Sequence, residues 1–115
     1  MTMNSLRIPI TTSQDLSAAA LSYTTSIGRR FKLESISIHF SVGVTETVTI
    51  TRDSGRGATY DTVLASIDLV GNSSYIFRPQ GEENEYSGDE IKVQVTNANA
   101  TGSAYVEIKT SSHLQ

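Results

Sequence analysis

Residues 90–96 alternate strictly between polar and apolar side chains, directly after the turn Ser87-Gly88-Asp89. In an extended strand, successive side chains point to opposite faces, so Ile91, Val93 and Val95 share one face. The opposite face carries only polar side chains. This pattern predicts a β-strand with one buried face, and it constrains the fold of the chain more than any other feature.

The same alternation recurs in short runs along most of the chain, separated by turn residues. The clearest runs are 31–40, 46–52, 60–69, 74–78, 90–96 and 104–108, with weaker ones at 6–10 and 21–25. About eight strands at this spacing are typical of an all-β sandwich or barrel. Helical patterning is nearly absent. For residues 13–21, a short capped turn and the lead-in to a strand are alternatives, and the strand is favoured.

Two apolar sets of opposite parity occupy residues 31–40: Phe31 and Leu33, then Ile36, Ile38 and Phe40. One extra residue in a strand reverses which side chains face inward, so a β-bulge near residues 34–35 would place both sets in the core. Further along, a regular strand over residues 60–69 would bury one face. That inner face is expected to contain Val63, Ala65, Ile67 and Leu69.

The chain has 115 residues, which is the size of one domain. We expect residues 13–110 to form the β-sandwich domain and residues 111–115 to be a flexible C-terminal tail. Residues 1–12 contain Pro9, which cannot donate a hydrogen bond to a sheet, so this segment is an N-terminal arm or an edge strand. An arm would add a strand to a neighbour's sheet, whereas an edge strand would belong to the chain's own sandwich.

Composition excludes several classes of function. The net charge is −3, whereas a nucleic-acid surface normally needs a basic face. The chain has no cysteine, so disulfides, zinc–thiolate sites and cysteine nucleophiles are excluded. No segment approaches the ~20 apolar residues that span a membrane, and the N-terminus lacks the features of a signal peptide. We therefore expect a soluble, unprocessed chain that binds neither nucleic acid nor membrane.

Catalytic and metal-binding motifs are scarce. His39 is expected to point outward because it lies between two apolar residues, and His113 lies in the polar tail. Neither has a second histidine or a carboxylate at ligand spacing, and no Gly-x-Ser-x-Gly motif occurs. We therefore predict a protein that is not an enzyme and needs no cofactor.

Acidic residues form one cluster, which comprises Glu82, Glu83, Glu85, Asp89 and Glu90. Several carboxylates on a loop are the kind of ligand that Ca²⁺ prefers, but the spacing differs from that of an EF-hand. A solvated acidic loop is the favoured interpretation. Asp53 and Asp61, which bracket the Gly55-Arg56-Gly57 loop, are a second and weaker cation candidate.

Basic and tyrosine side chains are candidates for a binding surface. Arg29 and Arg30 form one basic cluster and Arg56 belongs to another, and each suits contact with an acidic protein neighbour. The five tyrosines could stack on sugars or line a protein interface, where tyrosine is enriched. Tyr105 is predicted to point outward and is the best candidate for exposure.

Four segments resemble a known class of proteins: residues 26–36 (SIGRRFKLESI), 60–64 (YDTVL), 76–79 (IFRP) and 86–91 (YSGDEI). Over roughly residues 18–110 the chain resembles small structural proteins found near the capsid genes of tailed bacteriophages. The resemblance implies a jelly-roll-like β-sandwich that acts as a capsid decoration (cement) protein. It further implies a trimer that binds the major capsid protein on the capsid surface, after synthesis in the cytoplasm of the bacterial host.

We therefore expect a non-enzymatic virion protein that stabilises the head by binding across capsid subunits. The alternative is a carbohydrate- or receptor-binding module of a phage fibre or tail. The residues expected at the interface are Leu6, Ile8, Pro9, Ile10, Arg29, Arg30, Arg56 and Tyr105.

Overall fold

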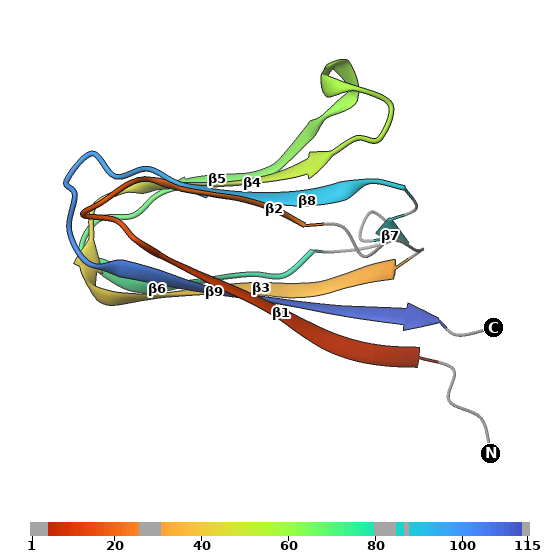
Figure 1. Ribbon diagram of the computed structural model, residues 1–115, viewed down its shortest axis with the longest axis horizontal. Helices are drawn as coiled ribbons and strands as arrows, with labels where there is room; N and C mark the ends of the chain where they lie inside the picture. The colour runs from red at the N-terminus through yellow and green to blue at the C-terminus, as the bar shows by residue number, and fades with distance from the viewer. Residues whose placement is uncertain (1–4, 26–30, 80–84, 87, 114–115) are drawn as a thin grey trace.

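The computed structural model describes residues 5–25, 31–79, 85, 86 and 88–113, which form two antiparallel sheets that face each other (Figure 1). The strands in these segments are β1 (Ser5–Asp15), β2 (Leu21–Thr25), β3 (Phe31–Val44), β4 (Thr47–Asp53), β5 (Thr62–Asp68), β6 (Asn72–Phe77), β7 (Glu85–Tyr86), β8 (Glu90–Val95) and β9 (Ser103–His113). A short 3-10 helix, η1 (Ala58–Tyr60), lies in the loop between β4 and β5.

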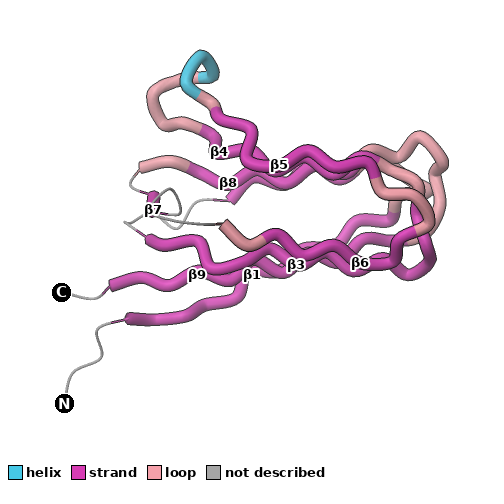
Figure 2. Tube along the Cα trace, turned by 180° about the vertical axis from the view of Figure 1, so that it is seen from behind, coloured by secondary structure: helices cyan, strands magenta, loops and turns pink. Residues whose placement is uncertain are grey.

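The first sheet has the strand order β1-β9-β3-β6, and the two-residue strand β7 also pairs with β3. The second sheet has the order β2-β8-β4-β5. With β7 set aside, the eight long strands form two four-stranded sheets between which the chain passes repeatedly, as in a jelly roll (Figure 2). The prediction of an all-β, jelly-roll-like sandwich of about eight antiparallel strands is confirmed.

The core lies between the sheets and consists of the inward side chains of both. It contains Leu16, Leu21, Phe31, Leu33, Ile36, Ile38, Phe40, Val44, Val48, Ile50, Leu69, Ile91, Val93, Val95, Ala104, Val106 and Ile108. The pairing of β3 with β9 changes register between Leu33 and Ser35, which is the bulge expected near residues 34–35. This bulge turns both apolar sets of β3 into the core, as the sequence predicts.

The inner face predicted for residues 60–69 is wrong at Val63, which does not point into the core. At Ile67 the predicted direction is right, but the side chain is only partly covered. Ala65 lies opposite Ile50 of β4, but Val63 lies opposite the next residue, Thr51, so Leu64 is an extra residue that reverses the alternation. Val63 is therefore 60% exposed. Ile67 keeps the inward direction but is 39% exposed, because β5 lies at the edge of its sheet.

Both ends of the sandwich differ from the expected domain boundaries. Every residue of β1 pairs with β9, so this strand continues across the boundary expected at residue 12 and forms the edge of the chain's own sheet. Strand β9 extends to His113, so residues 111–113 belong to the sandwich and the expected tail starts too early. The buried Ser111 hydroxyl donates to Glu34 at 2.8 Å. Residues 13–21 form the end of β1 and a turn that leads into β2, without a helix.

Candidate functional site

The described histidine and acidic side chains do not form a metal-binding cluster. His39 is exposed, as expected, and lies opposite Ser74 on one side and Tyr105 on the other. Within the part of the chain that the structure describes, no three histidine or acidic residues are grouped so that they could hold a metal ion. No helix of the described segments has the length and apolar character needed to cross a membrane.

Among the residues of the two cation candidates, Asp61 and Asp89 accept hydrogen bonds from protein groups, and three glutamates are not fully described. Glu82 and Glu83 lie outside the described residues, and the side chain of Glu85 is not described. Asp61 accepts a hydrogen bond from the Ser54 backbone N–H at 2.8 Å. The described members therefore give no support to a Ca²⁺ site.

Asp89 clamps the β4–β5 loop to the turn before β8. Its two carboxylate oxygens accept hydrogen bonds from Arg52 Nε at 2.8 Å and from the Gly55 backbone N–H at 3.0 Å. The Gly55 hydrogen bond and the Arg52 guanidinium hold the pKa of Asp89 below its ordinary value. A Cβ atom at Gly55 would clash with the Gly88 carbonyl oxygen, so the two backbones lie in close contact. The clamp steadies a hairpin that extends beyond the body of the sandwich (Figure 1).

We expect Asp89→Ala to release this hairpin and to reduce the free energy of unfolding by about 1–2 kcal/mol, because two charge-assisted hydrogen bonds are lost. Hydrogen exchange would detect the release as faster exchange at the Gly55 amide. The control is Asp61→Ala, which should speed exchange at Ser54 and leave Gly55 protected. Unchanged protection of Gly55 in Asp89→Ala would contradict the clamp.

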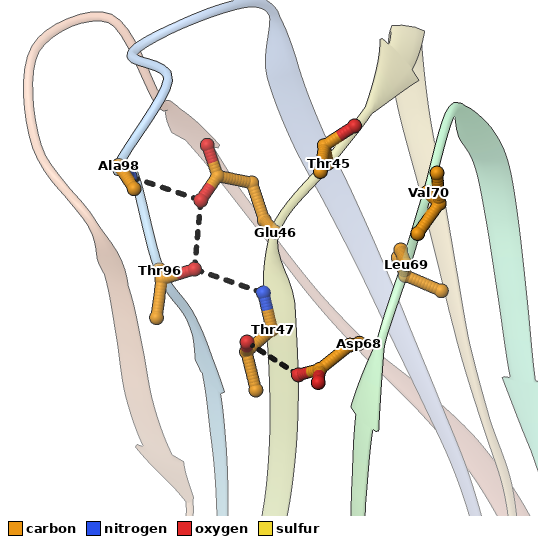
Figure 3. Close-up of a pocket in the computed structure, with 8 residues that line it drawn as sticks. All are labelled: Thr45, Glu46, Thr47, Asp68, Leu69, Val70, Thr96 and Ala98. Atoms are coloured by element: carbon orange, nitrogen blue, oxygen red, sulfur yellow. Dashed lines mark hydrogen bonds between the residues drawn. The ribbon is translucent and has the colours of Figure 1, made fainter.

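Glu46 organises the opposite end of the sandwich (Figure 3). Although its side chain is only 4% exposed, its carboxylate accepts three hydrogen bonds: from the Thr96 hydroxyl at 2.7 Å, from the Ala98 N–H at 2.9 Å and from the Asn99 N–H at 2.8 Å. Burial raises the pKa of Glu46, but these hydrogen bonds outweigh it and hold the pKa below its ordinary value. Glu46 therefore acts as an anchor for the β8–β9 loop.

A surface hollow of about 320 Å³ lies beside this anchor. Its lining consists of Thr45, Glu46, Thr47, Asp68, Leu69, Val70, Thr96 and Ala98. The polar groups within it already bond to one another: the Thr96 hydroxyl also accepts from the Thr47 N–H, and the Thr47 hydroxyl donates to Asp68 (Figure 3). The carboxylates of Glu46 and Asp68 already accept hydrogen bonds from the protein, so these residues stabilise the loops and the hollow shows no evident ligand site. Glu46 was not among the predicted site residues, although the alternation of residues 46–52 places it on the same face as the buried Val48 and Ile50.

The predicted interface residues whose side chains the structure describes, Pro9, Ile10, Arg56 and Tyr105, are divided between the two sheets. Arg29 and Arg30 lie outside the described residues, and the side chains of Leu6 and Ile8 in β1 are not described. Elsewhere in β1, Pro9 is exposed whereas Ile10 is half-buried against the core. Arg56 is exposed in the β4–β5 loop of the second sheet. Tyr105 is exposed, as predicted, on the outer face of the first sheet.

Tyrosines do not form a shared platform among the described side chains. Tyr60 belongs to η1 in the β4–β5 loop, whereas Tyr105 belongs to β9 of the other sheet. Tyr23 and Tyr75 are half-buried against the core. This arrangement gives no support to a sugar-binding site made of several aromatic rings.

One lateral side of the sandwich, formed by strands β5 and β6, carries several exposed apolar side chains. Strands β5 and β6 are the free edges of the two sheets, since β5 pairs only with β4 and β6 only with β3. Of the exposed apolar side chains described, Val42 and Tyr105 lie elsewhere and five lie on these strands or close to β5 in the chain; we call this set the lateral stripe: Tyr60, Val63, Ile67, Val70 and Ile76. Strands β5 and β6 contain neither lysine nor proline, the residues that commonly protect an edge. The lateral stripe is therefore the best candidate for an interaction surface.

Comparison with known proteins gives one informative likeness. No protein-family model matches the chain, and no curated protein matches its sequence. A solved structure of a Bacillus endospore appendage, from work that describes a family of disulfide-linked pili, has the same fold with a TM-score of 0.56. The two sequences are 18% identical, and the match covers 97% of this chain and 90% of the appendage chain. At this identity the likeness establishes the fold alone.

Proposed function

We propose that the chain is a non-enzymatic structural protein that binds across the subunits of a protein assembly. The assembly we propose is the head of a tailed bacteriophage, where the chain would act as a decoration protein. The observation that carries the proposal is the lateral stripe on the free edges of a jelly roll. Free edges that lack lysine and proline and carry exposed apolar side chains favour binding to another protein chain.

The rest of the structure supports a mechanical role. A continuous apolar core and regular strand pairing give a stiff body, and Glu46 and Asp89 fix the loops at its two ends. The outer faces of the sheets carry many small hydroxyl side chains, such as Ser37 and Thr49, which are well suited to water. Binding is therefore expected at the edges and loops rather than at the sheet faces.

A subunit of a self-assembling fibre is a second candidate, favoured by the likeness to the endospore appendage. Disulfide linkage, which the description of that appendage names, is not available to this chain because it has no cysteine. Any fibre of this chain would depend on non-covalent contacts. Electron microscopy of the purified protein would reveal such fibres directly.

The proposed function is tested by analysing purified phage particles. We expect mass spectrometry to detect the chain in particles separated on a density gradient, at many copies per head and in the head fraction after tails are removed. Absence from the particles, or presence in the tail fraction only, would refute the decoration role.

A further inference from the structure

The β8–β9 loop, residues 96–102, is fixed to the end of the sandwich by hydrogen bonds rather than by packing. None of its side chains is buried, and none belongs to the core. The carboxylate of Glu46 accepts from three of its groups, the Thr96 hydroxyl and the backbone N–H groups of Ala98 and Asn99. Segments with few buried contacts open at a lower free energy than the core, so this loop can open while the sheets stay paired.

The loop is also strained at Ala100. This residue has a φ of 48°, and among the described residues it is the one non-glycine residue with a positive φ. A residue with a Cβ atom disfavours that conformation, and such strain persists only where the surrounding structure holds it. Opening of the loop would release the strain, so weaker anchoring by Glu46 should favour the open form.

The charged groups around Glu46 are all carboxylates. No basic side chain lines the hollow beside it; the other titratable group there is Asp68 of β5, which accepts from the Thr47 hydroxyl. The β1–β2 turn, which also bonds to the loop, adds Asp15, whose carboxylate accepts from Ser17. The described neighbours of Glu46 therefore stabilise its negative charge with hydrogen-bond donors and not with a cation.

A proton on Glu46 would weaken its hold on the loop. Its two carboxylate oxygens both face donors, the Ala98 N–H at one oxygen and the Asn99 N–H at the other. A proton on either oxygen places an O–H donor among N–H donors and removes the charge that strengthens these hydrogen bonds. We propose that protonation of Glu46 opens the β8–β9 loop as a unit while both sheets stay paired. This behaviour belongs to the fold and does not depend on the assembly proposed above.

Opening of the loop would uncover one end of the core. The backbone N–H of the fully buried Leu16 donates to the Gly102 carbonyl at 2.9 Å, and Asn97 Nδ2 donates to the Leu16 carbonyl at 3.4 Å. Both hydrogen bonds would be lost with the loop, so Leu16 becomes accessible to solvent. The β5–β6 turn is held instead by the Leu69 N–H, which donates to the backbone carbonyl of Glu46 at 2.8 Å. Protonation of the side chain leaves that hydrogen bond in place.

Native-state hydrogen exchange tests the opening in the wild-type chain, amide by amide. The amides of Ala98, Asn99 and Leu16 should be at least roughly tenfold less protected than the amide of the core residue Val93. Low concentrations of denaturant should not change their exchange, because a local opening exposes little surface. Equal protection of Ala98 and Val93 would overturn the proposal, since the loop would then open only when the whole chain unfolds.

The pH dependence identifies the proton. Burial raises the pKa of Glu46, but the hydrogen bonds of the closed loop hold it below the ordinary value of 4.5 that the open loop would restore. The protection of Ala98 and Asn99 should therefore be constant well above pH 4.5 and fall by up to about tenfold per pH unit below it. Protection that stays constant into acid would also overturn the proposal.

Two variants assign the effect to Glu46. In Glu46→Gln, the Ala98 and Asn99 amides should be weakly protected at every pH. The matched control, Asp68→Asn, should retain the wild-type pH dependence, because Asp68 bonds to Thr47 rather than to the loop. A pH dependence that survives in Glu46→Gln, or that disappears in Asp68→Asn, would contradict the role of Glu46. The wild-type profile is measured without any variant, so the proposal stays testable even if Glu46→Gln does not fold.

Discussion

Removal of residues 1–12 is expected to destroy the native sandwich rather than to release a dispensable arm. The deletion removes residues 5–12 of β1, each of which pairs with β9. It also removes Ile10, which packs against the core and lies opposite the fully buried Ile108. The three residues of β1 that remain cannot cover β9. We expect the loss of much of the roughly 5–15 kcal/mol that stabilises a typical domain.

The measurement is chemical denaturation followed by circular dichroism. The truncated chain should show no cooperative unfolding transition and should bind a hydrophobic dye. Deletion of residues 1–4, which precede β1, is the control and should leave the transition in place. If the chain without residues 1–12 unfolds cooperatively at nearly the same denaturant concentration, its own sandwich does not need β1. The alternative of an N-terminal arm that adds a strand to a neighbour's sheet would then be favoured.

Glu46→Gln is expected to produce the second large effect, a loss of about 2 kcal/mol in the free energy of unfolding at neutral pH. Both carboxylate oxygens of Glu46 accept hydrogen bonds from the β8–β9 loop, and an amide can retain only one acceptor oxygen. The matched control is Glu34→Gln, since among the described residues Glu34 accepts one hydrogen bond, from the Ser111 hydroxyl. Glu34→Gln should reduce the free energy of unfolding by clearly less than Glu46→Gln.

The effect of Glu46 also depends on pH, with a sign set by its lowered pKa. In the unfolded chain the carboxyl titrates near its ordinary value of 4.5, and in the folded chain it titrates below that value. The stabilisation is therefore complete well above pH 4.5 and is lost as pH falls through the folded pKa. In acid, the wild-type chain should approach the stability of Glu46→Gln. A constant difference between the two proteins from pH 7 down to pH 2 would contradict this account.

Local patterning was sufficient to predict most of the fold. The alternation at residues 90–96 and the reversed parity within residues 31–40 identified buried faces and one bulge, because both depend only on the two-residue period of a strand. The second bulge, at Leu64, was missed. Val63, Ala65 and Ile67 keep a regular alternation in the sequence, so nothing local reveals the extra residue; it appears only when β5 pairs with β4.

The expected interface residues stay a prediction, and only their exposure can be compared with the structure. The expected interface residues were chosen for charge, aromaticity and the proline in β1, but exposure depends on which strands lie at the edges. Val63 was expected on the inner face, yet it is 60% exposed. Glu46 has the parity of the buried Val48 and Ile50 and is itself buried, although glutamate is rarely buried without partners. The exposure of such side chains depends on which distant strands pair, and short sequence patterns do not reveal that pairing.

The central claim, that the chain works by binding across the subunits of a shell, is tested most directly by co-sedimentation with expanded, undecorated phage heads. We expect saturable binding at a fixed ratio of chains to capsid subunits, together with greater resistance of the decorated heads to heat. Failure to bind such heads, under conditions where the protein is folded, would contradict the claim.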